Sequence, residues 1–308
     1  MTVHVPILLR PIVDALVEPF KALSPDAAPH ACVDCTLGGG GHTAALLEAF
    51  RADPRLSHHR VISVDQDPEA IARAKERFRQ EIDSGHLILI HSRFSEIEAE
   101  LERLGFPILG LMADLGFSSD QLEDEDRGIS FKGDGPLDMR LDPTRGESAR
   151  QFLQKVTQSE LEKILEELGE ERFSRKVAAA IIQARRDRQL PDTTREFADL
   201  ITRAIPGPAR HGRIHAATRT FQALRIHVNE ELKELDQLLE RVIVSIKPGG
   251  RVAILSFHSL EDRRVKVAFK GELFEPLTKK PIEAEEDEIR VNPRSRSAKL
   301  RIAERVRT

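Results

Sequence analysis

The chain has 308 residues, a formal net charge of −4 and 32% charged residues, which is typical of a globular protein with room for two domains. This balance excludes a polybasic nucleic-acid coat, and no 18-residue apolar window exists that could span a membrane. The two cysteines, Cys32 and Cys35, provide neither a disulfide framework nor a second pair for a zinc site. We expect a cytoplasmic protein without signal peptide, membrane anchor or metal site, in which both cysteines are strand residues.

The first predicted helix covers about residues 7–20, where apolar side chains recur at helical spacing. A buried strand over residues 31–35 follows, and it leads into four consecutive glycines, Gly38 to Gly41, and a helix that begins near Thr43. Such a strand, glycine loop and helix bring backbone N–H groups close to a ligand. A plain tight turn would give the same pattern.

A second apolar strand over residues 61–65 ends in Asp65, a little over twenty residues past the glycines. An acid at this place can accept the hydroxyls of a ribose. Because the third glycine of the dinucleotide fingerprint is missing, a ligand with a ribose but no pyrophosphate fits better than NAD. S-adenosylmethionine is the obvious candidate. His42, at the start of the helix, could donate to its carboxylate, or bond only backbone or water.

Strands over residues 86–91 and 108–114 continue the alternation of strands and helices. This alternation predicts an α/β fold with a parallel sheet, helices on both faces and ligands at the carboxyl ends of the strands. The glycine loop, Asp65 and Asp114 should share that edge. Phe94, in a polar turn beside it, could cover an adenine.

The alternation stops after Asp114. A long irregular run over residues 115–145 is expected to be ordered because apolar residues are spaced along it, and residues 147–205 have the pattern of a helical insertion. Glycine 169 is a plausible residue just beyond a helix end. One long helix over about residues 217–246 should return the chain to a central strand at 251–257, with a final edge strand at 297–306.

Positive charge is concentrated between Arg172 and Arg225, where twelve Lys or Arg stand against four Asp or Glu. A basic tract on an acidic body suggests a local contact with phosphates, although solvated helix faces would have the same composition. Four arginines flank the return from the insertion and are predicted to face RNA phosphates: Arg210, Arg213, Arg219 and Arg225.

Nine stretches carry a close resemblance to one family: His4–Leu9, Asp34–Thr43, Asp65–Pro68, Asp114–Leu122, Asp134–Arg140, Gly169–Phe173, Ala217–Ile226, Ser256–Arg263 and Asn292–Arg301. They are similar to the RsmH (MraW) methyltransferases of bacterial 16S ribosomal RNA, over nearly the whole chain. Two departures are Ala216, where the family usually has proline, and Leu168, which is often tyrosine there.

The resemblance implies transfer of a methyl group from S-adenosylmethionine to the exocyclic N4 of one cytidine in the decoding region, cytidine 1402 in the family. Its substrate would be 16S rRNA in the small ribosomal subunit, and a homodimer is possible. It implies a Rossmann-like class I methyltransferase domain, residues 1–121 and 218–308, with an inserted substrate-recognition domain at 122–217. The cofactor site would comprise Gly40, Gly41, His42, Asp65, Phe94, Asp114 and Gln121.

The amino group of cytosine is a poor nucleophile, because its lone pair is delocalised into the ring. The enzyme therefore needs an acceptor that holds the N–H and aims the lone pair at the methyl group. Asp114 is the leading candidate, and Ser118 and Ser119 could complete the acceptor set, with Asp138 and His258 as weaker candidates. Alternatively, Asp114 only positions the cofactor.

Three other functions compete: an NAD-dependent oxidoreductase, a methyltransferase acting on another RNA, a small molecule or a protein, and an RNA-binding module without activity. The glycine spacing disfavours the first. The insertion and the basic tract favour RNA over a small metabolite.

Overall fold

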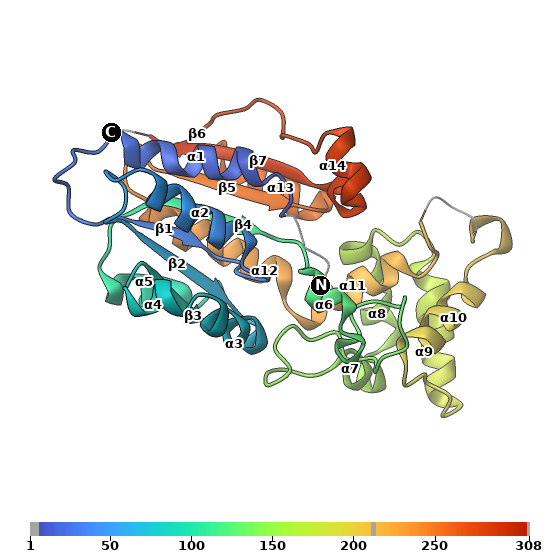
Figure 1. Cartoon of the computed structure of the whole chain (residues 1–308). Coiled ribbons are helices and arrows are strands. Elements are labelled where there is room, and N and C mark those ends of the chain that lie inside the picture. Colours follow the sequence, from blue (N-terminus) through green and yellow to red (C-terminus); the bar gives the residue numbers. More distant parts are fainter. Residues whose placement is uncertain (1–5, 211–213, 307–308) are drawn as a thin grey trace. The chain divides into compact units, whose positions relative to one another are not determined.

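The computed structural model describes residues 6–210 and 214–306, apart from the side chains of Ser119 and Asp120. The chain folds into two units (Figure 1). The sheet unit contains the residues up to Phe117 and those from Lys233 onward, and the helical unit contains Ser118–Leu232. The division differs from the predicted boundaries, since both α6 (Ser119–Glu123) and α11 (Thr218–Val228) belong to the helical unit.

The described residues of the sheet unit form a seven-stranded sheet in the order β3-β2-β1-β4-β5-β7-β6. β1 to β5 are mutually parallel, and β7 runs antiparallel to both β5 and β6. The strands are β1 (Ala31–Asp34), β2 (Arg60–Asp65), β3 (Leu87–His91), β4 (Ile108–Asp114), β5 (Arg251–Ser256), β6 (Phe274–Pro276) and β7 (Lys299–Arg305). This confirms the predicted Rossmann-like α/β fold with a parallel sheet, to which an antiparallel pair of strands is added at one side.

One strand prediction was wrong in its position. β7 was expected at an edge of the sheet, but it lies between β5 and β6. The reason is β6, a three-residue strand of sequence Phe-Glu-Pro, which is too short for an alternating pattern and contains a proline. A proline within a strand is tolerated only at an edge, and the edge is the position that β6 takes.

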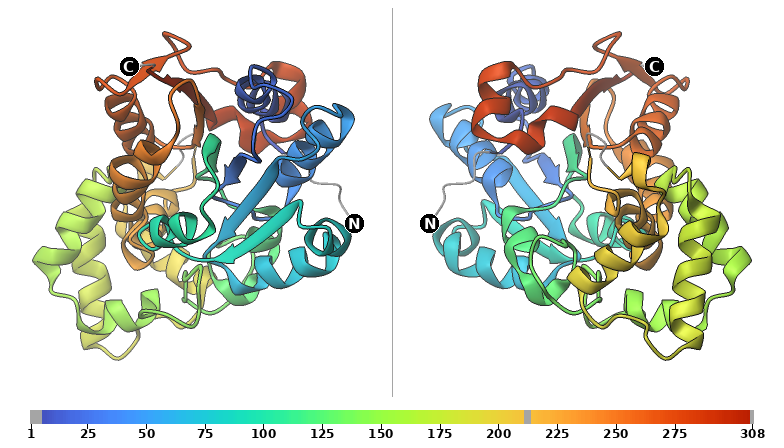
Figure 2. Two further views of the ribbon diagram at one scale, coloured as in Figure 1. Left: turned by 90° about the vertical axis from the view of Figure 1, so that its left-hand side faces the viewer. Right: turned by 90° about the vertical axis from the view of Figure 1, so that its right-hand side faces the viewer.

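Helices cover both faces of the sheet (Figure 1 and Figure 2). The central strands are buried on both sides, which explains their nearly continuous apolar sequences. Cys32 packs into one core, with α1 (Leu9–Lys21), α2 (Gly41–Ala52) and α3 (Pro68–Arg77), whereas the neighbouring Val33 packs into the other, with α5 (Ile97–Leu104) and α13 (Ser259–Ala268). Other described helices of this unit are α4 (Arg79–Asp83), α14 (Glu286–Val291) and η5 (Pro293–Ser297).

The helix that returns the chain to the sheet is interrupted, contrary to the single helix predicted. α11 ends at Val228, and Glu230 adopts a left-handed conformation with φ of 52°. Asn229 explains the break, because its side-chain amide donates to the carbonyl of Met139 at 2.8 Å and accepts from the N–H of Leu141 at 2.8 Å. The chain continues as α12 (Glu231–Gln237), η3 (Leu238–Val242) and η4 (Ile243–Ser245).

The helical unit has its own apolar core, which includes the buried Leu161, Ile181, Phe197 and Phe221. Its elements besides α6 and α11 are η1 (Glu125–Arg127), α7 (Ala149–Lys155), α8 (Gln158–Gly169), α9 (Ser174–Arg186), α10 (Thr194–Ala204) and η2 (Gly207–Ala209). Gly169 is the last residue of α8 rather than the residue beyond it. A Cβ there would lie 2.5 Å from the carbonyl oxygen of Arg219, so glycine is required by the close packing of α8 on α11.

Candidate cofactor site

The loop after β1 is tied to the ends of both neighbouring strands. β1 pairs with β2 on one side and β4 on the other, so their carboxyl ends meet at one edge. The N–H of Gly38 donates to Oδ2 of Asp65 at 2.8 Å, and the N–H of Asp114 donates to Oγ1 of Thr36 at 2.6 Å. The two acids predicted for the site are thus held by one loop.

A buried acid lies beneath this loop. Asp34 is fully buried, and it accepts hydrogen bonds from the Thr43 hydroxyl at 2.7 Å and from the Thr36 N–H at 3.1 Å. Burial raises the pKa of this carboxyl. Through Thr36 and Thr43, Asp34 joins the loop to the first turn of α2 and so fixes the shape of the site. Sequence reasoning did not assign it this role.

The glycines of the loop differ in what surrounds them. Gly40 has φ of 75°, and a Cβ there would lie 2.7 Å from the ring of Phe78, while a Cβ on Gly41 would overlap Pro6. These two glycines are required by the packing of the chain itself. A Cβ on Gly39 would meet no described atom within 4 Å, so Gly39 is the position that leaves room for a ligand. The four-glycine pattern could not distinguish these cases.

Asp65 is a buried acid that already accepts two backbone hydrogen bonds. Asp65 is the last residue of β2 and is only 8% exposed. Oδ2 accepts from Gly38 and Oδ1 from the N–H of Asp67 at 2.9 Å, and a carboxylate can accept about four hydrogen bonds. Burial raises its pKa to about 6, because the desolvation of the charged form outweighs these two hydrogen bonds.

Phe94 lies in the turn between β3 and α5. The N–H of Glu96 donates to the carbonyl of Arg93 at 3.1 Å and closes this turn, and the N–H of Ser92 donates to the carbonyl of Asp65 at 3.0 Å. The Phe94 ring is half-buried and packs against the core on the α5 side of the sheet. The chain that leads into the turn of Phe94 is therefore hydrogen-bonded to the backbone of Asp65.

Asp114 ends β4 and is half-buried, and its Oδ1 accepts the N–H of Gly116 at 2.9 Å. A Cβ on Gly116 would lie 2.6 Å from the ring of Phe257, which follows β5. The next residue, His258, has its Nε2 3.1 Å from Oε1 of the buried Glu261. His258 thus lies at the carboxyl end of the strand beside β4, and Glu261 is a neighbour that sequence reasoning missed.

His42 is buried, and its Nε2 lies 3.2 Å from the carbonyl oxygen of Ile7. This is the backbone contact that was weighed as the alternative to a ligand contact. A second contact to a ligand through the other ring nitrogen stays a prediction.

Four of the predicted catalytic and cofactor residues belong to the helical unit: Ser118, Ser119, Gln121 and Asp138. Ser118 and Gln121 form reciprocal hydrogen bonds at 3.1 Å across the first turn of α6: each backbone N–H donates to the side-chain oxygen of the other residue. Asp138 forms a two-pronged ion pair with Arg140, with both distances 2.7 Å. The predictions for the Ser119 side chain and for Arg213 fall outside the described residues.

The arginines predicted to face RNA differ in the groups that their guanidinium N–H groups contact, which are carbonyl oxygens in two cases and a carboxylate in a third. Arg210 is exposed and donates to the carbonyls of Ile205 and Arg203, and Arg219 donates to the carbonyl of Glu170 at 2.9 Å. Arg225 forms a two-pronged ion pair with Glu231 at 2.8 and 2.9 Å, and its side chain is 16% exposed. Its charge is already matched, so this geometry disfavours Arg225 as a phosphate ligand.

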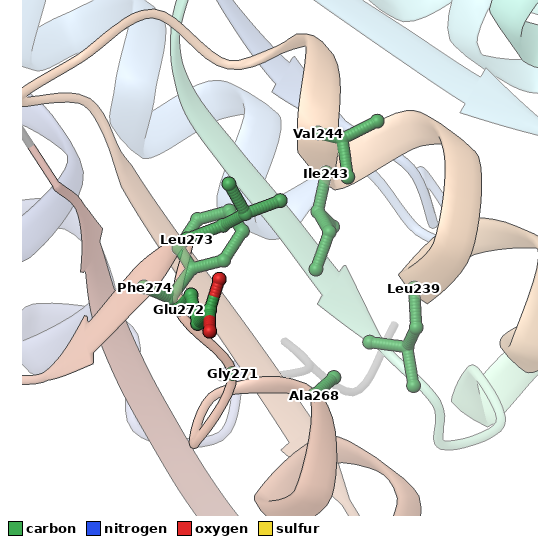
Figure 3. A pocket seen from close by; sticks show the side chains of 8 residues that line it. All are labelled: Leu239, Ile243, Val244, Ala268, Gly271, Glu272, Leu273 and Phe274. Carbon is green, nitrogen blue, oxygen red and sulfur yellow. The ribbon is translucent and has the colours of Figure 1, made fainter. Parts of the chain in front are cut away.

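An apolar pocket in the sheet unit is separate from this site (Figure 3). Its lining consists of Leu239, Ile243, Val244, Ala268, Gly271, Glu272, Leu273 and Phe274. Phe274 pairs with Arg305 of β7. The preceding residue of β7, Glu304, pairs with Arg251 at the amino end of β5. The pocket is therefore at the opposite edge of the sheet from Asp65 and Asp114. None of the described helices is long and apolar enough to cross a membrane.

The sequence matches the model of the MraW methylase family over residues 1–306. The chain belongs to this family. Curated relatives named ribosomal RNA small subunit methyltransferase H include one from Sorangium cellulosum, 49% identical over 94% of this chain and 89% of the relative. Another, from Geobacter sp., is 44% identical over 94% of this chain and 96% of the relative. A solved rRNA methylase from Streptococcus thermophilus covers 98% of this chain and 100% of its own, with 11% identity and a TM-score of 0.40, too distant to support an inference.

This member of the MraW methylase family is a methyltransferase that uses S-adenosylmethionine. The geometry of the sheet unit fits that cofactor. Gly39 leaves open space where the loop can approach a ligand, and the buried Asp65 carboxylate keeps acceptor capacity for two hydroxyls.

Proposed function

We propose that this enzyme methylates the exocyclic N4 of one cytidine in the decoding region of 16S rRNA, cytidine 1402 in the family. The proposed substrate is the small ribosomal subunit in the cytoplasm. The observation that carries the proposal is the match over nearly the whole chain, including the helical unit, to relatives named for methylation of small-subunit ribosomal RNA. A relative that shared only the sheet unit would support a methyltransferase without indicating its substrate.

The cofactor would be held by residues of three loops at the carboxyl edge of the sheet. Asp65 would accept the two ribose hydroxyls, and each charge-assisted hydrogen bond contributes about 1.5–3 kcal/mol. The glycine loop would approach the methionine part of the ligand at Gly39, and the ring of Phe94 would cover the adenine. When bound, S-adenosylmethionine supplies an electrophilic methyl group on a positively charged sulfur.

Asp114 would hold the amino group of the target cytosine. A carboxylate at the end of β4 can accept the N–H and orient the nitrogen lone pair toward the methyl group. Strong general-base catalysis is not needed, because the proton becomes acidic as the new bond forms. Four further residues are proposed to assist at the substrate: Ser118, Ser119, Asp138 and His258.

The helical unit would bind the RNA backbone through exposed cations. Arg210 and Arg219 extend from this unit with guanidinium groups held by carbonyl oxygens rather than by carboxylates. Carbonyl contacts leave the positive charge unneutralised, so both arginines keep their attraction for phosphates. For Arg213, which lies outside the described residues, the contact with phosphates is proposed from the sequence alone.

The test is nucleoside analysis of small-subunit RNA from cells with and without this protein. We expect one methylated cytidine to lose its N4 methyl group when the protein is absent, and to regain it when the gene is restored. An unchanged small-subunit RNA, with a methyl group lost from another RNA instead, would favour the alternative of a methyltransferase with a different substrate.

A further inference from the structure

We propose that Glu234 is a positioning residue of the cofactor site: its carboxylate holds the turn that carries Phe94 and thereby fixes the place of the adenine. This inference rests on the proposed contact between Phe94 and the adenine. Glu234 lies in α12, directly after the chain has returned from the helical unit to the sheet unit.

Both carboxylate oxygens of Glu234 accept hydrogen bonds from the same residue, Ser95. Oε2 accepts the N–H of Ser95 at 2.9 Å, and Oε1 accepts the hydroxyl of Ser95 at 3.0 Å. The two residues are 139 positions apart in the sequence. Glu234 is only 7% exposed, and a buried carboxylate is costly unless its hydrogen bonds are made. The contact is therefore a specific and well-formed one.

The residue that Glu234 holds is the immediate neighbour of Phe94. Phe94 and Ser95 are the two corner residues of the turn closed by Arg93 and Glu96. The start of this loop is fixed by the hydrogen bond from Ser92 to the carbonyl of Asp65. Glu234 supplies the second fixed point, so the backbone that carries Phe94 is held on one side at Ser92 and on the other at Ser95.

The surrounding helices support this role. Leu235 and Leu238 of the same segment pack into the core that also contains Ile97, the first residue of α5, and that contacts Phe94. The Glu234 charge also lies beside the amino end of α5, where a negative charge is favoured by the helix dipole. The segment that carries Glu234 is thus packed into the core, and its carboxylate holds the turn at Ser95.

The experiment measures the dissociation constants of two ligands by titration calorimetry on the full chain. S-adenosylhomocysteine and 5′-methylthioadenosine share the adenine and ribose, and only the first has the amino-acid part. Glu234→Ala should weaken both ligands by the same factor, about tenfold, because the lost hydrogen bonds to a charged group act only through the adenine contact. In a Phe94→Ala background, Glu234→Ala should cause no further loss.

Asp236→Ala is the matched control. It removes a carboxylate from the same helix, one that pairs with Arg264 at 3.0 Å and is 43% exposed, and it should leave both dissociation constants unchanged. If Glu234→Ala does not fold, Glu234→Gln keeps the size and one acceptor but turns an amide N–H toward the other donor, so a loss of about threefold is expected.

Additive losses in the double variant, or an equal loss in Asp236→Ala, would overturn the inference. Wild-type affinity in Glu234→Gln would also contradict it. If Phe94→Ala alone binds like wild type, the proposed adenine contact fails. If Phe94→Ala is weak but Glu234→Ala binds normally, the adenine contact stands and only the role of Glu234 is lost.

Discussion

The pKa of Asp65 predicts how cofactor affinity depends on pH. Burial raises this pKa to about 6, and in the proposed complex only the carboxylate form would accept both ribose hydroxyls. With a pKa of about 6, roughly nine in ten molecules carry the carboxylate, the form that the proposed ribose contact requires, at pH 7 and roughly one in ten at pH 5. Since affinity scales with the competent fraction, the dissociation constant should rise about tenfold between pH 7 and pH 5.

The assay is titration with 5′-methylthioadenosine, which has no group that titrates between pH 5 and 7. Asp65→Asn should bind more weakly at pH 7 and show an affinity independent of pH over this range. The charges of Asp34 and Asp67 both raise the pKa of Asp65. Because Asp65→Asn keeps these two acids, any pH dependence that they cause by themselves would remain in the variant. A flat wild-type profile, or the same slope in Asp65→Asn, would refute the assignment of Asp65 as the ribose acceptor.

The same shift has a consequence for the stability of the ligand-free enzyme. The folded pKa of Asp65 lies above its unfolded value of about 3.8, so the folded state binds more protons between about pH 4 and 6. The stability that protonation of Asp65 provides is complete below pH 4 and is lost as the pH rises through 6. Urea unfolding should therefore show wild type losing stability relative to Asp65→Asn across this window, by at most about 3 kcal/mol.

Three further predictions concern the chemistry, the packing and the RNA. Asp114→Asn should bind S-adenosylmethionine within a few-fold of wild type yet lose methyl transfer by about 10²-fold or more in single-turnover assays; a loss recovered by more cofactor would show that Asp114 only positions it. Gly116→Ala should lower the Tm and slow transfer, because its Cβ would lie 2.6 Å from the ring of Phe257, whereas Gly39→Ala should keep the wild-type Tm. Arg219→Ala should reduce the salt slope of binding to small subunits by about one unit or slightly less, with cofactor affinity unchanged; an unaltered slope would make it a solvated residue.

The parallel part of the sheet could be predicted because its signals are local. Continuous apolar runs followed by glycine or an acid indicate buried strands, and they placed Asp65 and Asp114 at one edge, as the structure has them. The order of β6 and β7 could not be predicted, since a three-residue strand containing a proline gives no periodic pattern.

What the sequence could not reveal depends on partners distant in the chain. Asn229 is acceptable within a helix, and only its bonds to residues 139 and 141, 90 and 88 positions away, explain why α11 ends there. The hydrogen bonds between Glu234 and Ser95 likewise could not be predicted from the residues near either one in the sequence. Four glycines in a row indicate a close approach, but only the surroundings show that Gly39 faces open space while Gly40 faces Phe78.

The most direct test of the central claim is transfer in vitro with purified components. Small ribosomal subunits from cells that lack this protein would be incubated with the enzyme and methyl-labelled S-adenosylmethionine, and the RNA would be digested and mapped. We expect label on the N4 of a single cytidine in the decoding region, at about one methyl group per subunit. Label spread over several sites, on another atom, or absent from small-subunit RNA would contradict it.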